Sequence, residues 1–314
     1  MYDNHLTTIH NSKKEQTDDN KHMIIFPYDV TEDRARFQKS VIDGDLGYYD
    51  TIARKFIPQE TLDSLLENII PDNENIDSAN DPRLSQSLNR IRRNLSVYQR
   101  NPSDSYAQIF LKYLSNRYLS SIREQKIDAA ILYVDVVGST KLATRLSASE
   151  LSSLVKVFSQ EMSIIISRHG GFVLKYAGDA VIAYFPSSMD FGNATENAIS
   201  CGNIMNTIVT QSLNFAFQDF ALPPIQVRIS IDFGNNEIIF LGPEPDLIGH
   251  TITIASKMIR FAKPGQIVIG ENAHKQLTST SAANFILAGS DIQWDYNDPG
   301  TGKIYPIYFS GDKK

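Results

Sequence analysis

The chain has 314 residues, of which 42% are hydrophobic, and its formal net charge is -6. This length and hydrophobic content suffice for one large or two modest cores, and the acidic balance argues against a general affinity for nucleic acids or membrane surfaces. The single cysteine, Cys201, excludes an internal disulfide, and no apolar run approaches the roughly 18 residues that span a bilayer. No apolar signal segment follows Met1, so we expect a cytoplasmic protein without a nucleic-acid or membrane partner.

The N-terminal third of the chain carries no chemical motif. Residues 1–22 are rich in Asn, Asp, Lys and His and contain almost no large apolar residues, which predicts a disordered tail. From residue 23 to 103, apolar residues recur at helical spacing, first after Pro58 and again from Leu84 to Tyr98. We therefore expect a mostly helical N-terminal region, and its lack of chemistry favours a regulatory role.

A further periodic segment joins that region to the rest of the chain. Ser103 is the expected N-cap, and apolar residues then recur from Ala107 to Ile122. This pattern predicts a connecting helix over residues 104–125. The apolar face of this helix has two interpretations. The helix packs on its own domain, or it forms a short coiled coil that pairs two subunits.

From residue 126 the periodicity alternates between that of strands and that of helices. The expected strands are 129–134, 172–176, 180–185, 225–233, 237–241, 267–269 and 304–309. The expected helices are 151–165, 193–210 and 251–261. The order β-α-β-β-α-β, with additions, describes a ferredoxin-like α+β sandwich over residues 126–314.

Two aspartates stand out in this part of the chain. Asp135 and Asp179 each end an apolar, β-branched run, where a strand would deliver a carboxylate to a sheet edge or turn. Carboxylate oxygens suit Mg²⁺, and the Gly/Ser/Thr turn after Asp135 can meet phosphate with backbone N–H groups. The pair therefore predicts metal-assisted chemistry on a nucleotide. Taken singly, Asp135 could instead cap the following helix, and Asp179 could favour a tight turn.

Four stretches with chemical character occur in a characteristic order and at characteristic separations. They are Val134–Thr140, Leu174–Asp179, Asp246–Gly249 and a helix and turn from Ala255 to Gly265. Any one of them is a weak signal, but together they make residues 126–314 resemble the catalytic domain of class III adenylyl/guanylyl cyclases. Residues 1–125 lie outside the resemblance.

The resemblance implies a catalytic homodimer with two composite sites. In that arrangement, Asp135 and Asp179 of one subunit hold two Mg²⁺ or Mn²⁺ ions, which serve the ribose 3′-hydroxyl and the triphosphate. The partner subunit supplies the groups that read the base. The phosphates are expected to lie against the backbone amides of Val137, Gly138, Ser139 and Thr140.

Lys175 and Asp246 match the positions at which the family recognises the base. An ammonium can donate to adenine N1, and a carboxylate can accept from the N6 amino group. Guanine presents the opposite pattern at those atoms, so the pair favours ATP. A solvated strand lysine and an ordinary loop carboxylate are the alternative interpretations.

Two positions depart from the family's pattern. Thr253 stands where the family usually has an Asn that orients the ribose, and Lys257 stands where it has an Arg that stabilises the transferring phosphate. Thr is shorter than Asn, and Lys keeps the charge of Arg but loses its two-pronged donor. We expect an adenylate cyclase that makes cyclic AMP and pyrophosphate, with Thr253 and Lys257 in these catalytic roles. The alternative is a catalytically weak or inactive cyclase-like module that binds nucleotide or pairs with another cyclase.

Overall fold

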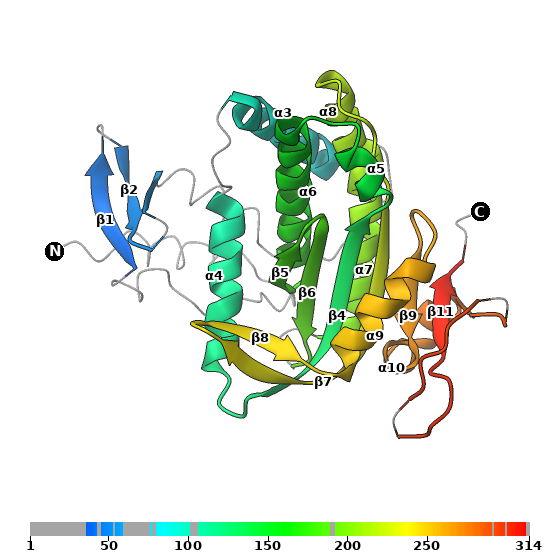
Figure 1. The fold of residues 1–314 in the computed structure, drawn as a ribbon. Helices are drawn as coiled ribbons and strands as arrows, with labels where there is room; N and C mark the ends of the chain where they lie inside the picture. The colour runs from blue at the N-terminus through cyan, green and yellow to red at the C-terminus, as the bar shows by residue number, and fades with distance from the viewer. Residues whose placement is uncertain are drawn as a thin grey trace. The chain divides into compact units, whose positions relative to one another are not determined.

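The structure is a computed structural model, which describes residues 36–42, 45–52, 54–58, 76, 80–100, 106–188, 192–290, 292–298 and 300–311. The chain divides into two compact units, Met1–Pro71 and Asp72–Lys314, whose elements Figure 1 labels. The tail expected over 1–22 and the helix expected after Pro58 lie outside the described residues. Within the described ranges, a search for apolar helices of bilayer-spanning length finds none.

The first unit contains a small antiparallel sheet. Its strands are β1 (Phe37–Ile42), β2 (Asp45–Asp50) and β3 (Lys55–Pro58). Tyr48 and Ile57 are buried and pair directly across two of the strands, and aromatic and β-branched pairs of this kind stabilise sheets. The prediction of a mostly helical region over residues 23–103 is therefore wrong for the strands between residues 37 and 58. Strands of only four to six residues are too short to give a clear periodic signal.

The second unit is built on one mixed sheet. Its described strands are β4 (Lys126–Val136), β5 (Phe172–Ala177), β6 (Ala180–Pro186), β7 (Val227–Leu241), β8 (Glu244–Ile248), β9 (Ile267–Gly270), β10 (Phe285–Leu287) and β11 (Ile307–Ser310). The order is β10-β11-β9-β7-β4-β6-β5, with β8 paired to the C-terminal part of β7. The two strands expected over 225–241 are one continuous strand, β7, whose hairpin partner is β8.

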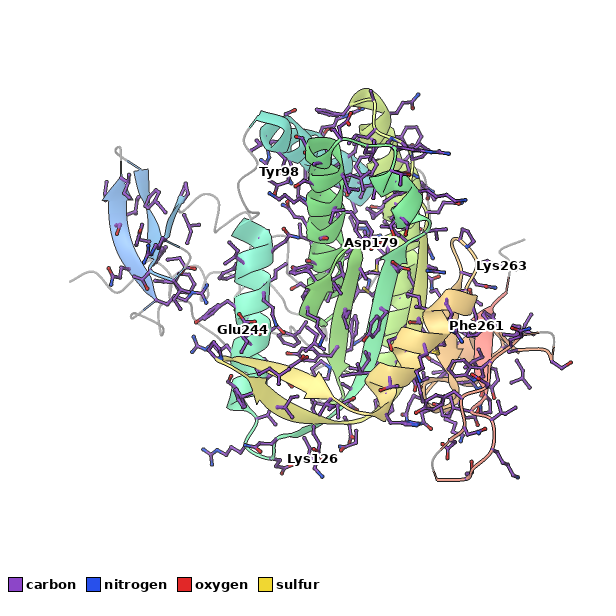
Figure 2. The ribbon with its side chains drawn as sticks, viewed as in Figure 1. Tyr98, Lys126, Asp179, Glu244, Phe261 and Lys263 are labelled. Carbon is purple, nitrogen blue, oxygen red and sulfur yellow. The ribbon has the colours of Figure 1, made fainter. Side chains whose placement is uncertain are left out.

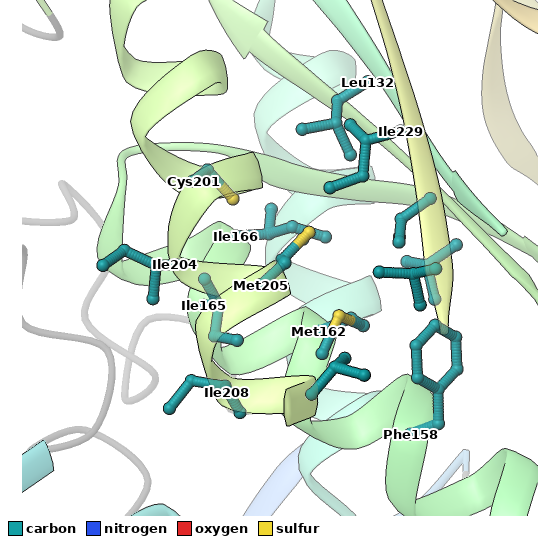
Figure 3. Close-up of a cluster of buried hydrophobic side chains, with 14 of the residues drawn as sticks. Leu132, Phe158, Met162, Ile165, Ile166, Cys201, Ile204, Met205, Ile208 and Ile229 are labelled. Carbon is teal, nitrogen blue, oxygen red and sulfur yellow. The ribbon is translucent and has the colours of Figure 1, made fainter. Parts of the chain in front are cut away.

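Two long helices, α6 (Ala148–Arg168) and α7 (Ala194–Ile208), pack on one face of this sheet. Their apolar sides meet alternate strand residues such as Leu132 and Ile229 and form the core in Figure 3. The path β4-α6-β5-β6-α7-β7 confirms the expected β-α-β-β-α-β order and the α+β class. The shorter helices are α5 (Ser139–Ala143), η2 (Val209–Leu213), α8 (Asn214–Asp219), η3 (Ile259–Phe261), α10 (Glu271–Lys275) and α11 (Ser279–Ala282).

Helix α3 (Pro82–Arg100) belongs to the second unit. It packs on α6, where Arg90 donates hydrogen bonds of 2.7 and 2.6 Å to the fully buried Glu161. A buried carboxylate needs such a partner because its desolvation alone is costly. The helix expected in this region is confirmed, but the domain boundary expected at residue 103 is not where the compact units divide.

The opposite face of the sheet carries α4 (Tyr106–Ser121) and α9 (His250–Met258). Helix α4 contacts β5 and β8, while α9 contacts β7 and β4. The helix expected over 104–125 is thus present, and it packs on its own sheet. Tyr133 and Asp135 lie on this face and are only half-buried, unlike their neighbours on β4. We call this face, which carries Asp135, the site face.

Candidate active site

The two aspartates expected to bind metal are neighbours in space. Asp135 is the penultimate residue of β4, and Asp179 lies in the two-residue turn that joins β5 to β6 (labelled in Figure 2). Gly178 has the positive φ of 65° that the first position of such a hairpin turn requires. Asp135 pairs with Ala180 in the β4–β6 register, which brings the two carboxylates together. Burial raises the pKa of Asp135; Arg228 opposes the shift and the Asp179 carboxylate adds to it.

Arg228 is a residue of this site that the sequence reasoning missed. It lies on β7 directly opposite Asp135, and its Nε and Nη2 atoms donate to Asp135 Oδ2 at 3.0 and 2.8 Å. The guanidinium offsets part of the negative charge that the two aspartates concentrate here. A signal was available, because Arg228 is a charged residue within an alternating apolar strand.

The aspartate pair fits a divalent cation. Asp179 Oδ2 is buried and has no hydrogen-bond partner among the described residues. A buried carboxylate oxygen without a donor is costly, and a hard cation would satisfy it. The described residues contain no group of three or more His, Cys, Asp or Glu side chains arranged to hold a metal. Ions held by Asp135 and Asp179 would therefore take further oxygens from phosphate and water, as Mg²⁺ commonly does.

The turn after Asp135 is shaped to leave backbone amides free at the start of α5. Gly138 is the N-cap of this helix and adopts a left-handed φ of 72°, and no side chain in the described part of the chain caps the helix. Free amides at a helix start can meet phosphate oxygens. The amide of Val137, however, donates to Gln226 O at 2.8 Å. The expected phosphate contact through the Val137 amide therefore needs correction, and the contact through Gly138, Ser139 and Thr140 stays a prediction.

The two residues expected to read the base are in direct contact. Lys175 Nζ on β5 lies 2.6 Å from Asp246 Oδ2 on β8. The other oxygen of Asp246 accepts from the Leu247 amide at 2.8 Å, which fixes the carboxylate. The lysine side chain is 41% exposed and the aspartate 20% exposed, so the pair is accessible from solvent. The fold thus brings together two groups of opposite charge that lie 71 residues apart in the sequence.

Thr253 and Lys257 project from α9 and are exposed. The Thr253 hydroxyl donates to the carbonyl of Gly249 at 3.3 Å, a bond within its own helix. Lys257 Nζ lies 5.2 Å from the centre of the Tyr296 ring, a cation–π distance. Both side chains are therefore engaged locally in the single chain and remain accessible to a second molecule.

Comparison with known proteins identifies the family. A family model described as the adenylate and guanylate cyclase catalytic domain matches residues 122–292, more than half of the chain. The chain therefore belongs to this family, the class III nucleotide cyclases. The resemblance drawn from the four sequence stretches is confirmed.

Individual relatives are distant. Cytidylate cyclase from Staphylococcus aureus is 31% identical over 156 residues, which cover 46% of this chain and 36% of that protein. Putative adenylate cyclase 3 from Rhizobium meliloti is 25% identical over 161 residues, which cover 51% of this chain and 25% of that protein. The chain thus spans well under half the length of these curated relatives. The crystal structure of the adenylyl cyclase CyaB from P. aeruginosa shares the fold, with a TM-score of 0.51, 21% identity and coverage of 60% of this chain and 96% of that chain.

Proposed function

We propose that this chain is an adenylate cyclase that converts ATP to 3′,5′-cyclic AMP and pyrophosphate. In this reaction the ribose 3′-oxygen bonds to the α-phosphorus, the bond from that phosphorus to the β-phosphate oxygen breaks, and the 3′-hydroxyl proton is released. Family membership supports the class of reaction. The observation that carries the choice of base is the contact between Lys175 and Asp246.

The Lys175–Asp246 pair offers one donor group beside one acceptor group. Adenine presents the complementary order, with an acceptor at N1 and a donor at the N6 amino group. Guanine presents a donor at N1 and an acceptor at O6. The ammonium donor of Lys175 would then face a donor, and the carboxylate acceptor of Asp246 would face an acceptor. A site built to bond a given base edge rejects an analogue that leaves its polar groups unpaired. GTP is therefore disfavoured.

At the other end of the substrate, Asp135 and Asp179 would hold two Mg²⁺ or Mn²⁺ ions. Such ions lower the pKa of the attacking hydroxyl and neutralise the leaving pyrophosphate. Arg228 keeps Asp135 oriented by its two hydrogen bonds. The amides of Gly138, Ser139 and Thr140, at the start of α5, would donate to phosphate oxygens.

A homodimer completes the proposed site. Thr253 and Lys257 are exposed; the hydroxyl of Thr253 bonds the carbonyl of Gly249, and the ammonium of Lys257 lies over the ring of Tyr296. From a second copy of the chain, Thr253 would hydrogen-bond the ribose and Lys257 would place its ammonium on the transferring phosphate. An isologous dimer would contain two such sites, each with metal ligands from one copy and these side chains from the other.

CTP is the second candidate substrate. Cytosine presents an acceptor at N3 beside the N4 amino donor, the same order that adenine presents at N1 and N6. The Lys175–Asp246 pair can bond either base, and the two bases differ in the size of the ring system and in the O2 carbonyl that cytosine carries beside N3. A relative named cytidylate cyclase is 31% identical over 156 residues, which favours including this nucleotide.

The test is an assay of the purified full chain with ATP, CTP, GTP and UTP in Mn²⁺, with products identified by mass spectrometry. We expect cyclic AMP as the main product and none from Asp135→Ala. Cyclic CMP as the main product would transfer the proposal to CTP. If ATP stabilises a folded dimer against heat but no cyclic product forms, the proposed enzyme activity is contradicted and a nucleotide-binding module is favoured. The departures from the family pattern at Thr253 and Lys257 would then explain the lack of turnover.

A further inference from the structure

A lysine from outside the family-matched region reaches the strand that carries Lys175. Lys112 lies on α4, upstream of residues 122–292. Its ammonium donates to the carbonyl of Leu174 and to Asn116 Oδ1, the latter at 2.8 Å. The Lys112 side chain is only 20% exposed. A mostly buried ammonium needs hydrogen-bond acceptors in place of water, and these two acceptors define its position.

The carbonyl that Lys112 binds belongs to an irregularity in β5. The β5–β6 register pairs Val173 with Ala183 and Lys175 with Ile182, so Leu174 is an extra residue without an opposite partner. An extra residue of this kind is a β-bulge, and its backbone groups drop out of the ladder. Because Leu174 is buried, its carbonyl needs another donor. Lys112 supplies that donor.

The bulge decides which face of the sheet Lys175 occupies. Side chains two apart on a regular strand share a face, so if β5 were regular from Val173 to Lys175, Lys175 would follow Val173 into the core under α6 and α7. With the bulge, Lys175 instead shares a row with Ile182 and Tyr133 on the site face. Only there can its ammonium meet Asp246.

Lys112 is also within electrostatic reach of the pair. Its ammonium lies 3.9 Å from Glu244 Oε2, two residues before Asp246 on β8 (Glu244 is labelled in Figure 2). Burial lowers the pKa of Lys112, the Glu244 and Asp246 carboxylates oppose that shift, and the Lys175 ammonium reinforces it. The helix α4 thus contributes one member of a charged cluster that contains both groups proposed to read the base.

We propose that Lys112 is a positioning residue for base recognition: by bonding the Leu174 carbonyl it holds the bulge that turns Lys175 toward Asp246. This inference rests on the proposed role of Lys175 and Asp246 in reading the base. Its consequence is that α4 takes part in substrate choice although it lies outside the family-matched domain. A displacement of α4 would weaken base recognition without touching the metal-binding aspartates.

The experiment compares Lys112→Met, Lys112→Arg and the control Lys303→Met, which removes an exposed lysine of a distant turn. For each we measure kcat and KM for ATP and GTP, the melting temperature, and amide hydrogen exchange over residues 173–177. For Lys112→Met we expect a KM for ATP raised about tenfold with a smaller change in kcat, a reduced preference for ATP over GTP, and faster exchange in β5. Lys112→Arg, which keeps a donor, recovers most of the loss, and Lys303→Met matches the wild type.

Lys112→Met with unchanged KM and base preference would overturn the inference, whatever its melting temperature, since a purely structural lysine would alter stability alone. If Lys112→Met does not fold, Asn116→Ala removes one acceptor of the same ammonium and should shift KM in the same direction by about threefold; no shift would count against the inference. A wild-type chain that cyclises none of the four triphosphates refutes the proposed function instead. The exchange measurement needs no turnover, so unchanged β5 exchange in Lys112→Met would refute the role of the lysine even then.

Discussion

Arg228 and Asp135 face each other across β7 and β4, and the guanidinium places both of its hydrogen bonds on one carboxylate oxygen, Oδ2. Asp179 lies on the other side of Asp135, close enough to raise its pKa. The arginine is therefore the group that makes two adjacent carboxylates tolerable in the absence of metal. Arg228 therefore belongs, with the two aspartates, to the end of the site proposed to bind metal.

Replacing Arg228 tests this compensation. We expect Arg228→Gln to lower the unfolding free energy of the metal-free protein by roughly 2 kcal/mol, because hydrogen bonds to a charged group are lost. The increase in melting temperature caused by Mn²⁺ should become larger, because the guanidinium of Arg228 no longer offsets the charge of the two carboxylates. Thermal melts with and without Mn²⁺ measure both effects. Arg93→Gln, a change on the exposed side of α3, should alter neither.

Asp179→Asn should make the metal-free protein more stable and inactive. The buried Oδ2 of Asp179 has no donor among the described residues and lies beside a second carboxylate. Removing the charge should add about 1–3 kcal/mol to the unfolding free energy without metal. Mn²⁺ should no longer raise the melting temperature. Asp295→Asn, at an exposed position, is the matched control, and a loss of metal-free stability in Asp179→Asn would contradict the assignment.

A mixing experiment tests the composite site. Asp135→Ala and Lys257→Ala should each be inactive alone, because every site in either homodimer is damaged. Mixed in equal amounts with free exchange, half of the dimers pair the two variants and contain one intact site, so about a quarter of the wild-type activity should return. A mixture of Asp135→Ala with Asp179→Ala, which damage the same half of the site, should stay inactive. Equal behaviour of the two mixtures would rule out shared sites.

The double variant Thr253→Asn, Lys257→Arg tests whether these two residues limit the rate. Arg restores a planar donor that can hold two phosphate oxygens at once, and such transition-state donors are worth about 10² in rate. We expect kcat for ATP to rise about tenfold or more while KM changes little. The measurement is steady-state kinetics beside each single variant. An unchanged kcat would show that some other step limits the rate.

The buried Asp232 should make the unfolding free energy of the chain depend on pH. It is fully buried on β7, the Tyr305 hydroxyl donates to it at 3.0 and 3.2 Å, and burial raises its pKa to about 7. An unfolded aspartate has a pKa of about 3.9, so between about pH 4 and 7 the folded chain holds the extra proton. Stability should therefore fall as the pH rises through that range and then level off. Asp232→Asn should flatten the slope of melting temperature against pH, whereas Asp128→Asn, near the surface, should preserve it.

Much of the catalytic half could be read from local patterns. Strands β4, β5, β6 and β9 and helices α6, α7 and α9 were recoverable because alternation and helical spacing are visible over a few residues. Strands β8 and β10 and the short helices α5, α10 and α11 were not predicted. Asp135 and Asp179 were recognisable because each follows an apolar run of the kind that predicts a strand. The small sheet over 37–58 was not recoverable, since its strands are only four to six residues long and depend on pairing with one another.

The sequence by itself determined the family and the β-α-β-β-α-β order, and it predicted the residues proposed to carry the chemistry, since these depend on spacing along the chain. Only the tertiary structure decided how they meet. The bonds from Arg228 to Asp135 and from Lys112 to Leu174 join residues 93 and 62 positions apart. Such contacts depend on strand register and on one extra residue in β5, and a shift of a single residue moves a side chain to the other face of the sheet. That register, set by packing of the whole sheet, places Lys175 against Asp246 and leaves Val137 without a free amide.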